Sequence, residues 1–231
     1  MQRFVVLTVG ALALLPLAAR GQGGAEKEKD ATKKVAGGGV LVSGWQARVD
    51  FPNRGQKVED LRFESMGGGF HITGGPHAIY WNPANVAKGT YTVHATFAKR
   101  GDSPGHVESY GLFMGGAHLN EDNQNYLYCV VFGNGTYSVI HRYGSETHQL
   151  ASRQANDAVS KSDAAGNAKD DIAWTVSADK VGCSVNGKEV FSAPKADVIG
   201  TGKLESTDGI YGLRASHNLS IHVSNFGTGA K

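Results

Sequence analysis

The sequence predicts an all-β protein: a two-sheet antiparallel sandwich of jelly-roll type, preceded by an N-terminal signal peptide. Apolar and polar residues alternate in about a dozen short segments, and turns rich in glycine, asparagine or proline separate these segments. No segment shows an apolar period of 3.6 residues over helical length. Many short strands with regular turns are typical of antiparallel sandwiches and barrels.

Residues 1–21 have the pattern of a secretory signal peptide. Arg3 precedes an uncharged apolar run from Phe4 to Leu17, and small residues follow the run. The run is shorter than the roughly 20 residues that a membrane-spanning helix needs. We therefore expect a secreted or periplasmic protein with no membrane span in the mature chain.

Residues 22–39 carry mixed charges, with glycine at both ends and few apolar side chains. Such a stretch buries too little apolar surface to offset the entropy of ordering it. The pattern predicts a flexible linker, followed by a single sandwich domain over residues 40–231.

The expected strands share period-two alternation or a fully apolar character. In chain order they are residues 45–51, 61–65, 69–74, 77–82, 89–99, 109–116, 125–133, 135–144, 147–152, a meander over 172–191, and then 209–216 and 218–227. Residues 125–132 are apolar on both faces, which predicts either a central strand covered on both sides or a strand whose outer face lines an aromatic groove. Residues 154–171 are polar and alanine-rich. They predict an exposed loop or one short helix near 156–161, capped by Asn156.

The second run of the meander is followed by Asn186-Gly187, the pair preferred in two-residue hairpin turns because both positions need positive φ. Its alternation predicts five side chains in the core between the sheets: Trp174, Val176, Val181, Cys183 and Val185. Cys129 and Cys183 both lie in strand-like segments of a chain expected in an oxidising compartment. They form either a disulfide or two buried thiols that act as small apolar residues.

The formal net charge is +2, and no stripe of lysine and arginine is present. The sequence therefore gives no electrostatic case for nucleic-acid binding.

The segment "DDIAWTVSADKVGCSVNGKEVF", residues 170–191, resembles part of concanavalin A-like lectin/glucanase and laminin G-like domains. In those domains a tryptophan-bearing strand, a turn, a short strand, a hairpin and a further strand follow in order. Residues 125–144 and 208–227 fit the same plan, and the resemblance covers about residues 70–226. The chain is similar in particular to exported bacterial proteins related to the 3-keto-disaccharide hydrolase group.

The resemblance implies a concanavalin A-like jelly roll with a role in carbohydrate binding or processing. Glucanases of this superfamily carry an ExDxxE motif whose outer glutamates perform the chemistry, and that motif is absent here. The nearest acidic pair, Glu121 and Asp122, is consecutive, so the two side chains would diverge on an extended strand. A glucanase of that type is not expected.

Six residues are candidates for sugar binding: His71, His77, Trp81, Tyr128, His141 and Arg142. The two histidines of "HITGGPH" lie close to Trp81 and could form a sugar-binding corner with a stacking ring; the alternative is an ordinary turn with Trp81 in the core. His141 and Arg142 have opposite parity, so one faces inward and the other outward. On a concave face, Arg142 could contact a sugar or a carboxylate; the alternative is a surface ion pair.

His106 and Glu108 follow a loop of glycine and proline and are candidates for a general acid/base pair; the alternative is two solvated side chains. Glu121 and Asp122 lie in an oxygen-rich loop that could bind calcium or form an ordinary turn. No HExxH or CxxC spacing indicates zinc. No cofactor is expected, with calcium as the alternative.

We therefore expect an exported carbohydrate-binding domain, or an accessory to carbohydrate processing, whose partners are oligosaccharides or polysaccharides. Two alternatives remain open at this point. One is a glycoside hydrolase-like enzyme that acts on modified 3-keto disaccharides, and the other is a non-catalytic structural or adhesion domain.

Overall fold

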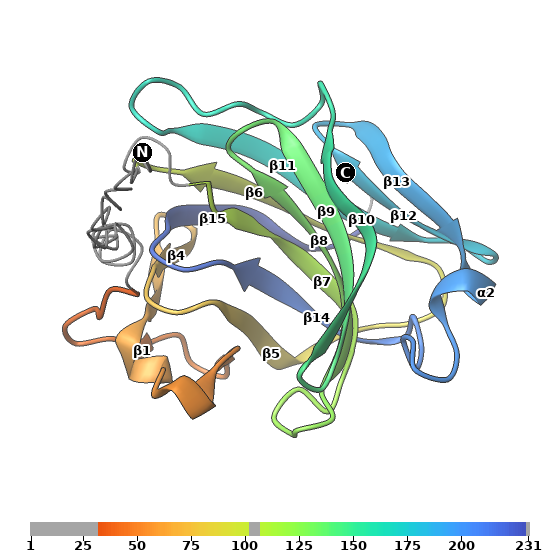
Figure 1. The fold of residues 1–231 in the computed structure, drawn as a ribbon, viewed down its shortest axis with the longest axis horizontal. Coiled ribbons are helices and arrows are strands. Elements are labelled where there is room, and N and C mark those ends of the chain that lie inside the picture. Colours follow the sequence, from red (N-terminus) through yellow and green to blue (C-terminus); the bar gives the residue numbers. More distant parts are fainter. Residues whose placement is uncertain (1–31, 102–106, 230–231) are drawn as a thin grey trace, which may run out of the picture. The chain divides into compact units, whose positions relative to one another are not determined.

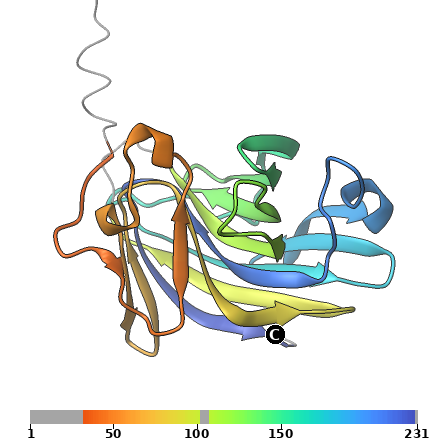
Figure 2. The same ribbon diagram turned by 90° about the horizontal axis from the view of Figure 1, so that it is seen from below.

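The computed structural model describes residues 32–101 and 107–229. Within these ranges the chain forms two stacked β-sheets, as Figures 1 and 2 show. The predicted all-β sandwich is confirmed. The predicted signal peptide lies outside the described residues, as does most of the predicted linker. Of the linker's described part, Val35 donates a backbone hydrogen bond to Asp60 over 3.0 Å. No helix of the described ranges has the length and apolar character needed to cross a membrane.

The first sheet has eight strands. In spatial order they are β1 (Gly39–Val40), β3 (Arg62–Met66), β4 (Gly69–Thr73), β15 (Ser220–Thr228), β6 (Tyr91–Lys99), β11 (Ala168–Val176), β12 (Lys180–Val185) and β13 (Lys188–Pro194). All neighbours are antiparallel except β1 and β3, which pair in parallel. The sequence pattern did not predict β1, because two residues are too few to show an alternation.

The second sheet has seven strands. In spatial order they are β10 (Glu146–Ala155), β9 (Thr136–Tyr143), β8 (Asn125–Phe132), β7 (Ser109–Ala117), β14 (Gly209–Ala215), β5 (Ala78–Ala87) and β2 (Gln46–Val49). Sequence neighbours β7, β8, β9 and β10 follow one another across the sheet, whereas β14 inserts between β7 and β5. This crossover brings the C-terminal part of the chain to the middle of the sheet.

The described residues hold little helix: two 3₁₀ turns, η1 (Pro52–Arg54) and η2 (Val58–Asp60), and α2 (Lys195–Val198). The alternative of a helix near residues 156–161 is wrong. The predicted loop is confirmed for residues 156–167 but was too long, because residues 154–155 belong to β10 and residues 168–171 to β11. The side chain of Asn156 accepts a hydrogen bond from the backbone of Ala158 over 2.9 Å, which closes a turn rather than capping a helix.

The main core lies between the sheets and contains the five meander side chains predicted to point inward, all with 0% exposure. Trp174 also donates its indole N–H to the carbonyl of Leu112 on the opposite sheet, over 3.1 Å. Asn186 and Gly187 have φ angles of 51° and 83°, so the predicted positive-φ turn is confirmed.

Cys129 and Cys183 form a disulfide, which decides between the two alternatives left open by the sequence. Cys129 belongs to β8 of the seven-stranded sheet and Cys183 to β12 of the eight-stranded sheet. The bond therefore ties the two sheets together across the core.

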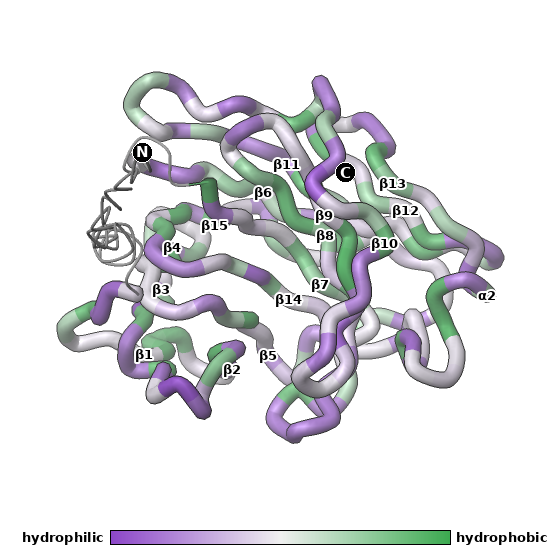
Figure 3. The backbone as a smooth tube through the Cα atoms, viewed as in Figure 1, coloured by the Kyte–Doolittle hydropathy of each residue, from purple (hydrophilic) through white to green (hydrophobic). Residues whose placement is uncertain are grey.

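A second apolar cluster covers the opposite face of the seven-stranded sheet, which we call the outer face. Its members are Ile79, Trp81, Phe113, Leu119, Tyr126, Tyr128, Val130 and Phe132. Successive residues of a strand face opposite sides. The fully apolar β8 therefore supplies Cys129 and Val131 to the main core and Tyr128 and Val130 to the outer face. Figure 3 shows the contrast between apolar β8 and the hydrophilic edge strand β10.

Candidate functional site: a pocket on the outer face

A pocket of about 330 Å³ lies on this outer face, and we call it the outer-face pocket. Its lining combines apolar, aromatic, hydroxyl and charged side chains: Asp50, Phe51, His77, Glu108, Ser109, Tyr128, Val130, Phe132, Ser138, Ile140, Arg142, Thr147, Gln149, Ser152, Arg153, Arg214 and Ser216. Small-molecule sites typically have this composition, an apolar wall with a few convergent polar groups.

The aromatic part of the pocket comes from Tyr128 and Phe132 of β8, which are 6% and 7% exposed. Both rings have a guanidinium over their faces. Arg214 lies 5.2 Å from the centroid of Tyr128, and Arg153 lies 4.1 Å from the centroid of Phe132. These cation–π contacts fix the positive charges beside the apolar wall.

A buried cluster of three charges lies at one side of the pocket. Arg214 donates to Asp50 through both terminal nitrogens, with a distance of 2.7 Å from Nη1 to Oδ1. Arg142 places its Nη1 3.5 Å from the same carboxylate, and the side chains of all three residues are 5–7% exposed. Burial by itself would raise the pKa of Asp50, but the two arginines outweigh it and lower that pKa.

The far wall of the pocket is built by edge strand β10. Its ladder with β9 is irregular between Ala151 and Gln154. Because a bulge breaks the period of two, the consecutive residues Ser152 and Arg153 both line the pocket. Arg153 has a φ of 41°, and its backbone N–H donates to the hydroxyl of Ser138 over 2.9 Å.

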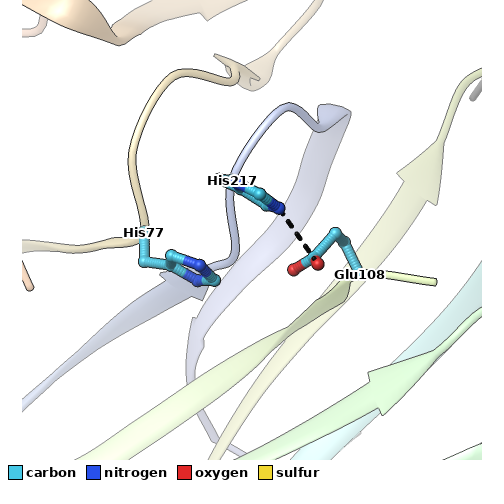
Figure 4. Close-up of side chains that lie close together, drawn as sticks. All are labelled: His77, Glu108 and His217. Atoms are coloured by element: carbon cyan, nitrogen blue, oxygen red, sulfur yellow. Dashed lines mark ion pairs between the residues drawn. The ribbon is translucent and has the colours of Figure 1, made fainter. Parts of the chain in front are cut away.

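At another side of the pocket, His77, Glu108 and His217 lie close together, as Figure 4 shows. The Nε2 atom of His217 is 3.2 Å from Oε1 of Glu108. The rings of His77 and His217 stack, with centroids 4.7 Å apart and an angle of 11° between their planes. Burial, with a contribution from Arg214, lowers the pKa of His77 to about 4.

Backbone contacts hold the segments that carry these three side chains. The N–H of Asn218 donates to the carbonyl of Gly75 over 3.0 Å, and Gly74 donates to Leu219. A Cβ atom at Gly75 would lie 2.1 Å from the carbonyl oxygen of Asp60. Glycine is thus required at this position, because the chain segment leading to His77 passes close to the backbone of Asp60.

Four of the residues predicted from the sequence line the outer-face pocket: His77, Glu108, Tyr128 and Arg142. The placement of Arg142 on the outer face agrees with the opposite parity of its neighbour His141, which is 3% exposed and contacts Asn125.

The other candidates lie elsewhere. Trp81 is 1% exposed within the outer-face cluster, so its ring is not a surface platform. His71 belongs to β4 of the other sheet, where it contacts Ser220. His106 lies outside the described residues. Glu121 and Asp122 each contact a different side chain: Glu121 lies 3.5 Å from His118, and Asp122 lies 3.3 Å from Arg48.

Sequence reasoning missed Asp50, Arg214, His217 and the contribution of β10. Of these, only Arg214 could have been recognised from the sequence, since it is a single arginine within the otherwise apolar strand "GIYGLRA". A buried arginine normally has a charged partner. Asp50 and His217 come from loops whose position depends on the strand order.

Solved structures with a similar fold include a carbohydrate-binding module, CBM66, from Bacillus subtilis. That match has 11% identity and a TM-score of 0.56, and it covers 84% of this chain and 99% of that module. A B. subtilis protein of unknown function with a galectin-like fold matches with 14% identity and a TM-score of 0.52 over 81% of this chain and 89% of its own. The laminarinase catalytic domain of Thermotoga maritima matches with 13% identity and a TM-score of 0.52 over 80% and 91%, respectively.

No protein-family model matches the sequence, and neither does any curated protein. At identities of 11–14% the structural likeness carries information about the fold alone. The described part of the chain has a two-sheet β-sandwich fold of jelly-roll type.

Proposed function

We propose that the protein binds carbohydrate in the outer-face pocket. The observation that carries this proposal is the pairing of an apolar wall, formed by Tyr128, Val130 and Phe132, with a surrounding set of hydroxyl, amide and charged groups. A sugar ring has the same division, since its C–H face packs on apolar surface while its hydroxyls need donors and acceptors at the edge.

An oligosaccharide is a better fit than a monosaccharide. A second pocket of about 310 Å³ shares Asp50 and Arg142 with the outer-face pocket, and Gln124 and Ser145 add polar groups to it. The two pockets thus meet at the buried charge cluster and offer room for more than one sugar unit. The likeness to a carbohydrate-binding module and to a laminarinase domain supports a glycan partner.

Export to a secreted or periplasmic location is part of the proposal. It is supported by the signal-like pattern of residues 1–21 and by the disulfide between Cys129 and Cys183, since such bonds persist in oxidising compartments.

Hydrolysis of a glycosidic bond is a second candidate function, favoured by the position of Glu108 beside His217 at the pocket wall. Two-carboxylate glycosidases need a second acidic group. The other carboxylate that lines the pocket, Asp50, is held by Arg214 and Arg142. The arrangement therefore favours binding over hydrolysis. Activity on 3-keto disaccharides belongs to this second candidate.

Calorimetric titration with a panel of soluble oligosaccharides and polysaccharides tests the proposal. Arg153→Ala and Gln149→Ala remove exposed groups of the pocket wall. Each should weaken binding by about tenfold, the loss of roughly one good hydrogen bond. Arg62→Ala is the matched control, since Arg62 pairs with Glu64 on the other sheet.

Absence of binding to every saccharide would reject the proposal and favour the structural or adhesion alternative. Equal losses in Arg153→Ala and Arg62→Ala would place the binding site outside the pocket. Release of a reducing sugar that disappears in Glu108→Gln would instead favour the hydrolase.

A further inference from the structure

We propose that His77, Glu108 and His217 form a binding site for one divalent transition-metal ion, with Zn²⁺ as the reference case. Two imidazoles and one carboxylate are a donor set that Zn²⁺ and its neighbours in the first transition series accept. Within the described residues, this is the one group of three or more His, Cys, Asp or Glu side chains whose ligand atoms cluster.

The distances suit a small ion. One ligand atom from each of the three residues lies within 4.8 Å of the other two, and Nε2 of His217 is 3.2 Å from Oε1 of Glu108. In a tetrahedral zinc site with bonds of about 2.0 Å, neighbouring ligand atoms are about 3.3 Å apart. The His217–Glu108 pair already has this spacing.

His77 is the ligand that has to move. Its ring stacks on that of His217 with centroids 4.7 Å apart, so the two coordinating nitrogens do not yet converge on one point. Coordination of one ion by all three residues therefore requires the His77 ring to change its orientation relative to His217 and Glu108. The ring of Phe51, whose centroid lies 6.1 Å away, packs edge-on against His77 and borders this movement.

The backbone that carries the ligands is fixed by contacts between the three segments. Ser216, next to His217, donates its N–H to the carbonyl of Ser109, next to Glu108, over 2.8 Å; the hydroxyls of the two serines are also 2.8 Å apart. Asn218 donates to Gly75 on the segment that leads to His77. Because the backbone is already ordered, less conformational entropy is lost when the three side chains bind a metal ion.

Three protein ligands leave a fourth position of a tetrahedral site open. Because His77 and Glu108 both line the outer-face pocket, the open position faces the pocket. The site therefore has access for an incoming ion and for one further oxygen ligand. The inference stands on the side-chain cluster alone and holds whether or not the pocket binds sugar.

Cobalt and zinc titrations of the full chain test the inference. Both cysteines are in the disulfide, so no thiolate competes for the ions. After removal of metal with a chelator, the wild-type protein should bind one Co²⁺ per chain, with the visible absorption of a low-coordinate site. Zn²⁺ should displace the cobalt and abolish the absorption.

Variants assign the binding to these residues. His77→Gln, Glu108→Gln and His217→Gln should each reduce the Zn²⁺ affinity by at least about tenfold, as expected for loss of a direct ligand. His222→Gln is the matched control, because His222 lies on β15 of the other sheet and pairs with His71. It should bind Zn²⁺ as wild type does. Thermal melting of each metal-free variant checks that it is folded.

Two results would overturn the inference. One is a folded wild-type protein that binds neither ion at micromolar concentrations, which would show that the contact between His217 and Glu108 is not part of a metal site. The other is unchanged affinity in the folded ligand variants. Neither readout uses a saccharide, so failure here is distinct from failure of the proposed function.

Discussion

Arg214 forms a two-contact ion pair with Asp50, although 164 residues separate them in the chain. Arg214 lies in β14, an interior strand of the seven-stranded sheet, and Asp50 directly follows β2 at its edge. Arg142 approaches the same carboxylate from β9. Two guanidiniums and one carboxylate thus share a nearly buried position beside the outer-face pocket.

Arg214→Met should destabilise the protein by about 3–5 kcal/mol, because removal of one partner leaves a buried charge with too few compensating groups. The loss is measured as the free energy of unfolding in urea. Arg62→Met, which breaks the more exposed pair with Glu64, is the control and should have a smaller effect. Similar losses in both variants would contradict the view that burial makes the Asp50 pair important.

Trp174→Ala should destabilise the protein by about 3–5 kcal/mol. Trp174 is fully buried between the sheets, and its indole donates to Leu112. Thermal and urea denaturation measure the effect. Saccharide affinity in the fraction that stays folded should not change, since Trp174 is remote in the fold from the outer face. A variant that kept its melting temperature would contradict the assigned packing.

Removal of the disulfide should lower stability by about 4 kcal/mol, as estimated from the chain entropy of a loop of 54 residues. The comparison is between wild type and the double variant Cys129→Ala, Cys183→Ala. A reducing agent should destabilise the wild type and leave the double variant unchanged. A wild type insensitive to complete reduction would show that the bond contributes little.

Stability should fall in mild acid partly because of His141. Burial, with a smaller contribution from His148, lowers the pKa of His141 to about 4, below the value near 6.5 of an unfolded chain. Between these two pH values the unfolded chain binds more protons, so stability decreases as the pH falls through this range. His141 contributes at most about 1.4 kcal/mol of unfolding free energy per pH unit. Its contribution is smaller than this limit because its neighbour His148 is partly exposed to solvent.

His141→Gln keeps a polar contact for Asn125 and has no titrating group, so its stability should decrease less steeply than that of wild type between about pH 6.5 and pH 4. Urea denaturation across this range measures both curves. The pKa of His77 is also lowered to about 4, but His77 is present in both proteins, so the difference isolates His141. Parallel curves would contradict the assignment.

Much of the fold could be predicted because strand patterns are local. Trp174, Val176 and Val181 alternate with polar neighbours, and burial of one strand face requires this alternation. The Asn186-Gly187 turn follows from the φ angles that each residue tolerates. The two-sided character of residues 125–132 predicted either a strand covered on both sides or one whose outer face lines an aromatic groove. All of β8 is buried, and its outward side chains line the outer-face pocket.

The candidate site was only partly predictable. Tyr128 and Arg142 were predicted because the parity of a strand residue assigns its side chain to one face. His77 and Glu108 were predicted because they are polar residues in loops next to strands. Trp81 was ambiguous, since the same alternation fits a buried ring and an exposed one, and only the packing of Leu119 and its neighbours places it in the outer-face cluster.

The sequence by itself determined the all-β class, the approximate positions of all strands except β1, the meander and its turn. Tertiary structure alone decided that Asp50 meets Arg214, that His77 meets His217, and that Cys129 meets Cys183. The physical reason is that any two strands can form the same backbone hydrogen bonds, so these bonds do not determine which strands become neighbours in a sheet. The insertion of β14 between β7 and β5 depends on burial of the whole core, and it is this order that brings distant residues together at the pocket.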